Sequence, residues 1–422
     1  MTHRGKISFF LLPLIFVLNV QAGAQEFTFR FPNYDFINYE ESILHFEGES
    51  QKYFELFYRK LNKLITKGDG QIQILHIGDS HIQADFFPGE MRQRVQSFEK
   101  GIQGARGFIF PYSVAKTNNP PDYKVSASGN WERCRNITRQ TSCDLGIAGI
   151  NIMTTDSVSS MTFQFNNKAA GVQIFNQIRI YHNIRQTGYD FILKNYEGPL
   201  KKVVNLAEGY TEFWVKEYLT SLELVIYRCD SNRNPFVLHG IYFGNDFPGI
   251  VYSSLGVNGA ETYSFLRCNL FEEQLKSLHP DLVIISLGTN DAYPKGFNSD
   301  IFYTNYDSLL KKVRNALPDA ALILTTPGDS YRNKNHSNVN NAKAGEVIYM
   351  MALQHDAAVW DLYEVMGGLN SILKWQRKGL TNADRLHLSK EGYILQGELL
   401  FSAFFDSYDT YLNKYIGEDG LD

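Results

Sequence analysis

The sequence predicts an α/β protein with a parallel sheet, interrupted in its middle by a β-rich insert. Helical and strand patterns alternate before about residue 110 and again from about residue 250, as in a parallel sheet with right-handed crossovers. Between 111 and 249 no long helical pattern occurs. Short alternating runs separated by turn residues stand there instead, which favours a β-sandwich.

The first α/β part contains two expected helices with a strand between them. Apolar residues recur at near-helical spacing from about 50 to 67, and Gly-Asp-Gly at 68–70 breaks the pattern. The run QIQILHI (71–77) is an expected strand. A helix is expected over PGEMRQRVQSFEK (88–100), with its proline at the first position and Gly101 just past its end.

The second α/β part repeats the alternation. One of its runs is apolar enough to be a strand buried on both faces of a sheet. The expected strands are GIVYSSLG (249–256), DLVIISLG (281–288), AALILTTP (320–327) and AAVWDL (357–362), and the expected helices cover 260–277, 300–316, 342–355 and the residues from 389 onward.

The N-terminal residues have the pattern of a secretory signal peptide. Arg4 and Lys6 precede an apolar run over 7–20, and Ala-Gly-Ala at 22–24 provides a small-residue cleavage site. The run is too short to span a bilayer comfortably, and no other segment looks transmembrane, so no stable membrane insertion is expected. A buried helix is the alternative interpretation. The signal predicts a periplasmic or extracellular protein.

These patterns together give a domain organisation. The sequence predicts a signal peptide at 1–24, a first α/β part at 25–110, the inserted β-rich domain at 111–249, and a second α/β part at 250–422. A chain of 422 residues is consistent with two domains.

Charge and cysteine content limit the possible partners. The formal net charge is -4 and no long Lys/Arg run occurs, so nothing indicates nucleic acid or an anionic membrane surface. Cys134 and Cys143 are close enough to close a loop in an oxidising compartment, although sequence alone leaves the pairing of the four cysteines open. Histidines and carboxylates do not cluster at ligand spacing, so neither a metal nor another cofactor is expected.

Polar side chains and glycines follow the expected strands, at the point where each strand ends. Ser80 follows the first strand, Gly259 the second and Asn290 the third, while Asp384 and His387 stand just before the last helix. Because open parallel sheets place their sites at the carboxyl ends of the strands, we expect these groups at one edge of one sheet.

This set of residues permits acyl transfer. A serine hydroxyl becomes a good nucleophile only when a base takes its proton, and His387 can be that base. Asp384, three residues earlier, can fix the imidazole tautomer. A tetrahedral oxyanion then needs donors, which the backbone N–H groups of Ser80 and Gly259 and the side-chain amide of Asn290 can provide.

The same residues resemble the conserved blocks of the SGNH (GDSL-type) hydrolases. The resemblance implies a flavodoxin-like three-layer α/β/α fold and a serine esterase, and it covers both α/β parts but not the insert. The α/β-hydrolase alternative requires G-x-S-x-G, which the chain lacks. The blocks are Gly78-Asp79-Ser80, Gly259 in VNGAET, Gly288-Thr289-Asn290-Asp291 and Asp384-Arg385-Leu386-His387.

Two departures point to a subgroup of that family. His81 stands where many members have leucine, and the insert makes the distance from Ser80 to Asn290 far longer than a minimal domain needs. Both features resemble bacterial enzymes that act on O-acetylated cell-wall or other polysaccharides, in which a carbohydrate-binding-like β-sandwich accompanies the esterase. The resemblance therefore implies an acetylated polysaccharide as the partner of this protein.

Several candidate residues have a structural alternative, among them Asn290, which could be an ordinary turn residue after its strand. Ser80 could be an ordinary turn serine, and a second Gly-Asp-Ser occurs at 328–330, although Ser330 falls out of order for the family. His81 points poorly for accepting the proton of its neighbour, and His76 is expected to pack under the sheet.

Asp79 is expected to bond turn amides, and Gly256 to be a turn glycine. His81 and, in the insert, Trp214 are kept as candidate substrate-binding residues. Trp214 lies on the polar face of the expected strand TEFWVKEYL (211–219), where its indole could stack on a sugar or pack against a neighbouring segment. The other expected insert strands are MTFQFN (161–166), GVQIFNQIRIYHN (171–183) and SLELVIYR (221–228).

Three functions fit these observations. The first is a secreted serine esterase that removes O-acetyl groups from a polysaccharide, either peptidoglycan or another acetylated glycan. The second is an O-acyltransferase that uses the same site, and the third is a glycan-binding surface protein with vestigial activity. The sequence names neither the polysaccharide nor the oligomeric state.

Overall fold

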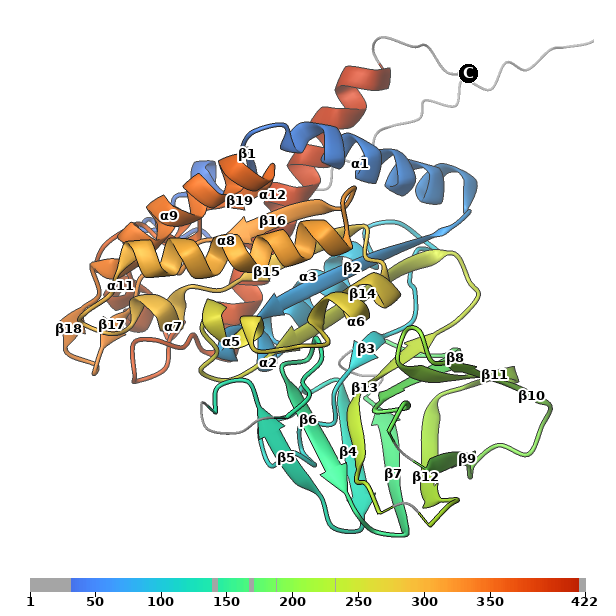
Figure 1. The fold of residues 1–422 in the computed structure, drawn as a ribbon. Coiled ribbons are helices and arrows are strands. Elements are labelled where there is room, and N and C mark those ends of the chain that lie inside the picture. Colours follow the sequence, from blue (N-terminus) through green and yellow to red (C-terminus); the bar gives the residue numbers. More distant parts are fainter. Residues whose placement is uncertain (1–31, 139–142, 167–170, 187, 232, 417–422) are drawn as a thin grey trace, which may run out of the picture. The chain divides into compact units, whose positions relative to one another are not determined.

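Figure 1 shows the computed structural model of the chain, which describes residues 32–138, 143–166, 171–186, 188–231 and 233–416. The expected signal peptide lies outside these residues. From Asn33 onward the described residues form one compact unit. Within the described part of the chain, no helix is long and apolar enough to cross a membrane.

The α/β part is built around a six-stranded sheet in the order β1-β19-β16-β15-β2-β14. Its strands pair in parallel except for the short edge strand β1, which is antiparallel to β19. In chain order the parallel strands are arranged 2-1-3-4-5, which is the flavodoxin-like order and confirms the expected fold class. The strands are β1 (His45–Phe46), β2 (Gln71–Gly78), β14 (Gly249–Gly256), β15 (Leu282–Ser286), β16 (Ala321–Thr325) and β19 (Ala358–Trp360).

Helices cover the two faces of this sheet, which gives the three-layer arrangement (Figure 1). Helices α1, α3 and α12 pack together, and α5, α6, α8 and α9 form the second group. The two groups consist of α1 (Ser50–Lys67), α3 (Phe87–Val95) and α12 (Lys390–Ile416), and of α5 (Thr262–Leu266), α6 (Phe271–Leu278), α8 (Ser299–Ala316) and α9 (Asn340–His355). Shorter elements are α2 (Ser80–Gln83), α7 (Thr289–Ala292), α10 (Leu362–Val365), α11 (Ser371–Arg377), β17 (Tyr331–Arg332) and β18 (His336–Ser337).

Two of the predicted helices have different bounds in the structure. The single helix expected over 260–277 is wrong, since α5 and α6 are separate and Asn269 between them turns its side chain to the insert. The helix expected over 88–100 ends at Val95 instead. The next residue, Gln96, caps the helix, and its buried side chain donates to the carbonyl of Ile250 at 2.6 Å.

The insert consists of two antiparallel sheets, as the alternating runs predict. One sheet has the order β10-β11-β8-β13-β6-β5 with β3 paired to β13, and the other has the order β4-β7-β12-β9. The larger sheet starts before residue 111, because β3 begins at Gly107 and pairs with β13. The domain boundaries given from the sequence remain a prediction. The strands are β3 (Gly107–Ile109), β4 (Tyr123–Ser128), β5 (Glu132–Arg135), β6 (Ile150–Thr154), β7 (Val158–Phe165), β8 (Phe175–His182), β9 (Tyr189–Leu193), β10 (Leu200–Asn205), β11 (Tyr210–Leu219), β12 (Ser221–Arg228) and β13 (Phe236–Gly244).

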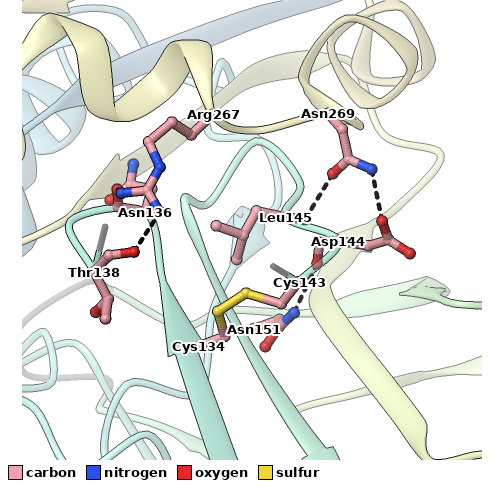
Figure 2. Close-up of a disulfide and its surroundings, with 9 residues drawn as sticks. All are labelled: Cys134, Asn136, Thr138, Cys143, Asp144, Leu145, Asn151, Arg267 and Asn269. Atoms are coloured by element: carbon pink, nitrogen blue, oxygen red, sulfur yellow. Dashed lines mark hydrogen bonds between the residues drawn. A yellow bond between two sulfur atoms is a disulfide. The ribbon is translucent and has the colours of Figure 1, made fainter. Parts of the chain in front are cut away.

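A disulfide joins Cys134 and Cys143 at the end of β5 (Figure 2). The residues next to it contact the α/β part. The Arg267 guanidinium donates to the backbone carbonyl of Asn136 at 2.8 Å and to that of Thr138. These bonds attach the insert to the segment between α5 and α6.

A second pair of contacts lies on the other side of the disulfide (Figure 2). Asn269 donates to the Asp144 carboxylate at 2.7 Å and accepts the Leu145 N–H at 2.9 Å. The same Asn269 that separates α5 from α6 therefore holds the insert, which explains why helical periodicity failed at this position.

Candidate active site

Ser80 stands in a sharp turn at the carboxyl end of the central strand β2. It is the first residue of α2, and Asp79 caps that short helix by accepting the His81 N–H at 2.9 Å. Gly78 at the end of β2 has no room for a side chain, because a Cβ there would meet Ile82 at 2.3 Å and the carbonyl oxygen of Ser286 at 2.6 Å. The Ser80 hydroxyl is thereby held clear of the sheet edge.

A relay of hydrogen bonds connects Ser80 to the loop before α12. The Ser80 Oγ lies 2.9 Å from Nε2 of His387, and Nδ1 of His387 lies 2.8 Å from Oδ2 of Asp384. The Nδ1–H group donates to the carboxylate, so the lone pair of Nε2 faces the serine hydroxyl. The structure thus brings together all three residues that the sequence predicts for the relay.

The Asp384 carboxylate is itself fixed by its own loop. Its Oδ1 accepts the backbone N–H groups of Leu386 and His387, each at 3.0 Å. Burial would raise the pKa of Asp384, but the bonds from the His387 ring and from these two N–H groups outweigh it and lower the pKa below its usual value. Asp384 therefore stays ionised beside the imidazole.

The three expected oxyanion donors lie around the same cavity as Ser80. Gly259 has a φ of 81°, which an L side chain rarely adopts. Within the described residues, the N–H groups of Ser80 and Gly259 have no acceptor, so both are free to donate. Asn290 differs, since its Nδ2 donates to Oδ2 of Asp79 at 2.9 Å and to the carbonyl of Ala260 at 3.0 Å. Both N–H groups of this amide are therefore engaged, and one of them must turn partly towards an oxyanion to stabilise it.

The cavity in front of Ser80 has a volume of about 550 Å³. Phe86 and Tyr393 contribute aromatic surface to its lining. The other lining side chains are mostly polar, and no carboxylate is among them. They include Asn118, Asn258, Asn382 and Lys390.

His81 lies behind the candidate base instead of lining this cavity. Its ring stacks on that of His387, with centroids 5.2 Å apart and planes inclined by 29°. Its Nδ1 lies 2.8 Å from the Tyr393 hydroxyl. Burial and the neighbouring His387 lower the pKa of His81 to about 3, so His81 stays neutral. A substrate contact by His81 remains a prediction.

His76 and Gly256, which the sequence predicts to be structural, are absent from the lining of the cavity. His76 is fully buried under the sheet, bonded to the hydroxyls of Tyr252 and Ser286 at 2.8 Å each. Gly256 ends β14 where a side chain would meet the Asp79 carbonyl at 2.4 Å, so close approach of two backbones requires this glycine.

Neither Ser330, in the second Gly-Asp-Ser, nor Trp214, the candidate sugar contact in the insert, lines the cavity. Ser330 is buried and accepts a bond from Nδ2 of Asn341 at 2.9 Å. Trp214 is half-buried on β11, opposite Lys201 and Gln177 of the neighbouring strands. Sugar stacking by Trp214 stays a prediction.

Sequence reasoning missed several residues of the cavity. Asn258 stands next to Gly259 in the block VNGAET, so the block itself could have indicated it. Asn118 belongs to the segment between β3 and β4, far from every block, and only the fold brings it to the site. Among the described residues, no group of histidine, cysteine or carboxylate side chains is arranged to hold a metal ion.

Comparison with known proteins shows what this chain is similar to. Residues 237–395 match the model of the GDSL-like Lipase/Acylhydrolase family, a range that contains Gly259, Asn290, Asp384 and His387 and begins after Ser80. A solved peptidoglycan O-acetylesterase aligns with a TM-score of 0.68 and 22% identity, over 87% of this chain and 99% of the other. No curated protein matches.

Two further solved structures align with the chain over a smaller range. A lipase/acylhydrolase from Enterococcus faecalis covers 38% of this chain and 77% of its own, with a TM-score of 0.31 and 22% identity. An acetylxylan esterase from Geobacillus stearothermophilus covers 38% and 73%, with a TM-score of 0.31 and 20% identity.

The matched segment indicates the class of this protein. Residues 237–395 are similar to GDSL-like lipases and acylhydrolases, which supports a carboxylic ester hydrolase. The fold, including its additional antiparallel sheets, is similar to that of a peptidoglycan O-acetylesterase.

Proposed function

We propose that this protein is an exported serine esterase that removes O-acetyl groups from a polysaccharide, with peptidoglycan as the first substrate to test. One observation carries the proposal. The relay from Ser80 through His387 to Asp384 opens into a polar cavity, where two backbone N–H groups are free to donate.

The geometry supports acylation of Ser80. Its Oγ attacks the acetyl carbonyl carbon while Nε2 of His387 takes the hydroxyl proton. Negative charge develops on the carbonyl oxygen, which the N–H groups of Ser80 and Gly259 and the amide of Asn290 stabilise. The C–O bond to the sugar then breaks, and His387 gives its proton to the departing sugar oxygen. The product is acetyl-Ser80.

Deacylation uses the same groups in reverse. Water gives a proton to His387 and attacks the acetyl carbon, and the second oxyanion occupies the same donors. The bond from the carbonyl carbon to Oγ breaks, His387 returns the proton to Ser80, and acetate leaves. If a sugar hydroxyl takes the place of water, the same site transfers acetyl instead of hydrolysing it.

The lining of the cavity supports a glycan as the substrate. Side-chain amides of Asn258 and Asn382 can donate to and accept from sugar hydroxyl and N-acetyl groups, and Phe86 and Tyr393 provide aromatic surface. The similarity to a peptidoglycan O-acetylesterase over 87% of this chain favours a cell-wall polymer over xylan. Export to the periplasm or beyond, which the expected signal peptide at 1–24 provides, is part of the proposal.

Acetate release tests the proposal directly. The mature protein and its Ser80→Ala variant are incubated with O-acetylated peptidoglycan and, separately, with acetylated xylan. We expect the wild-type protein to release acetate from peptidoglycan and the Ser80→Ala variant to release none. Release from xylan alone would contradict the substrate. If a folded protein releases no acetate from either polymer but acetyl appears on added acceptor sugars, the site is a transferase. If the folded protein shows neither release nor transfer, the glycan-binding alternative is favoured.

A further inference from the structure

We propose that Gln83 and Asn118 are positioning residues for the oxyanion donor Gly259, so that the insert is needed to form the esterase site. This inference depends on the proposed function for its catalytic meaning. It rests on three side-chain amides, those of Gln83, Asn118 and Asn258, which we call the amide cluster.

The amide cluster joins three separate segments of the chain. Gln83 belongs to α2, which begins with Ser80, and its Oε1 accepts the backbone N–H of Asn258 at 2.8 Å. Its Nε2 donates to the carbonyl oxygen and to Oδ1 of Asn118, both at 2.9 Å. Asn258 in turn donates through Nδ2 to Oδ1 of Asn118 at 2.5 Å. The nucleophile turn, the insert and the loop of Gly259 therefore share one network.

The loop of Gly259 has little other support on its cavity side. A side chain built at Gly259 would meet no atom within 4 Å, so the cavity face of this residue is open. Backbone bonds from Val257 to Gly78 at 3.2 Å and from Ala260 to Val257 at 2.9 Å hold the two ends of the loop. The bonds to Asn258 fix the peptide next to Gly259, and through it the direction of the donating N–H.

The segment that carries Asn118 is fixed to the α/β part on both sides. Before it, the Tyr112 hydroxyl donates to the carbonyl of Gly256 at 3.0 Å. After it, the buried Asp122 carboxylate is paired with Arg92, at 3.1 Å, and with Arg106. Arg92 also pairs with the buried Asp85, at 2.6 Å. Asn118 is thus held firmly enough to position other groups.

The burial of Gln83 indicates a positioning role. Its side chain is 2% exposed, so it does not face the cavity, yet both ends of its amide are used on the loop and on the insert. Burying an amide costs free energy unless it is fully bonded, so an apolar residue would serve packing alone equally well. A misplacement of about 1 Å near a reacting group can cost about 10²-fold in rate, which gives the cluster a functional reason.

The test compares Gln83→Met and Asn118→Ala with Asn195→Ala. Asn195 is a matched control in the insert, where its side chain likewise bonds backbone groups, of Ser221 at 3.0 Å and Glu223 at 2.9 Å. We expect kcat for a small acetyl ester to fall about 10- to 100-fold in the first two variants, with KM within about threefold. The double variant should lose less than the product of the two single losses, because both act on one loop.

Hydrogen exchange of the 257–261 peptide provides a readout that needs no activity. We expect faster exchange in Gln83→Met and Asn118→Ala but not in Asn195→Ala. Unchanged exchange, or kcat losses no larger than those of Asn195→Ala, would overturn the inference. A raised KM with unchanged kcat would overturn it too, since Asn118 would then bind substrate directly. An inactive wild type whose variants show faster loop exchange would refute the proposed function while leaving the positioning role.

Discussion

Asn290 donates a hydrogen bond to Asp79 at the base of the candidate site, with 2.9 Å between Nδ2 and Oδ2. The same carboxylate accepts the N–H of His81 through its other oxygen, also at 2.9 Å. One buried carboxylate therefore orients both the turn that carries Ser80 and the amide expected to donate to the oxyanion. Burial is also the main reason that the pKa of Asp79 is raised to about 7.

Replacing Asp79 with asparagine should impair Asn290. In Asp79→Asn, one oxygen can still accept the His81 N–H, but an amide nitrogen then faces the Asn290 nitrogen, and two donors cannot bond. We expect kcat to fall about 10- to 100-fold while the fold is kept, since loss of a whole oxyanion donor costs about 10²–10³. Steady-state kinetics on a soluble acetyl ester measures this. An unchanged kcat would mean that Asn290 needs no partner.

Removing the ring of His81 should slow the reaction through His387. The stacked ring and its bond to the Tyr393 hydroxyl fill the space behind the imidazole. His81→Leu keeps apolar bulk but loses the flat surface, so we expect about a tenfold slower labelling of Ser80 by an organophosphonate. Tyr393→Phe, which removes only the bond, should have a smaller effect. Equal labelling rates in wild type and His81→Leu would show that the stacking has no role in orienting His387.

The disulfide should contribute to the stability of the protein. Cys134→Ser with Cys143→Ser removes a cross-link in a segment that also bonds to the α/β part. We expect a loss of about 2–3 kcal/mol in the free energy of unfolding, measured in urea under non-reducing conditions. Cys229→Ser removes an exposed free thiol and is the control, with an expected change within about 0.5 kcal/mol. Equal stabilities would contradict the expectation.

Buried histidines should make folding sensitive to acid. His239 in the insert is fully buried, and burial lowers its pKa from 6.5 to about 4. Between these values the unfolded chain binds the proton and the folded chain does not, so stability falls as the pH falls from about 6.5 towards 4. His239→Phe should remove this term, worth at most about 1.4 kcal/mol per pH unit.

Urea unfolding at pH 7.5 and pH 5 measures the difference between wild type and His239→Phe. The raised pKa of Asp79 acts with the opposite sign, but it is common to both proteins and cancels in the comparison. His336→Phe, the same substitution at an exposed position, is measured alongside as the control. An identical pH dependence in wild type and His239→Phe would show that His239 does not contribute.

The parts of the fold that sequence predicts well are those with strong local patterns. The apolar run of β15 predicts a buried strand, and the amphipathic pattern of α1 predicts a helix. The alternation of such strands and helices then predicts a parallel sheet. Parallel order places Ser80, Asn290 and His387 at one sheet edge, so the relay could be anticipated before its distances were known.

The parts that sequence misses depend on contacts across long sequence separations. Asn118 reaches the site because Asp122 is buried against Arg92 and Arg106, and no local pattern indicates that pairing. Asn269 interrupts a helical pattern because its side chain bonds to the insert. β1, only two residues long, exists because β19 offers it an edge to pair with. In each case a tertiary contact overrides or adds to local preference.

Covalent labelling tests the central claim most directly. The mature protein is treated with an alkyl fluorophosphonate, and the modified peptide is identified by mass spectrometry. We predict one adduct, on Ser80, which is absent in Ser80→Ala and strongly slowed in His387→Ala because the base that activates the hydroxyl is lost. An adduct on Ser330 in the second Gly-Asp-Ser, or an unmodified Ser80 in a folded protein, would contradict the assignment of Ser80 as the nucleophile.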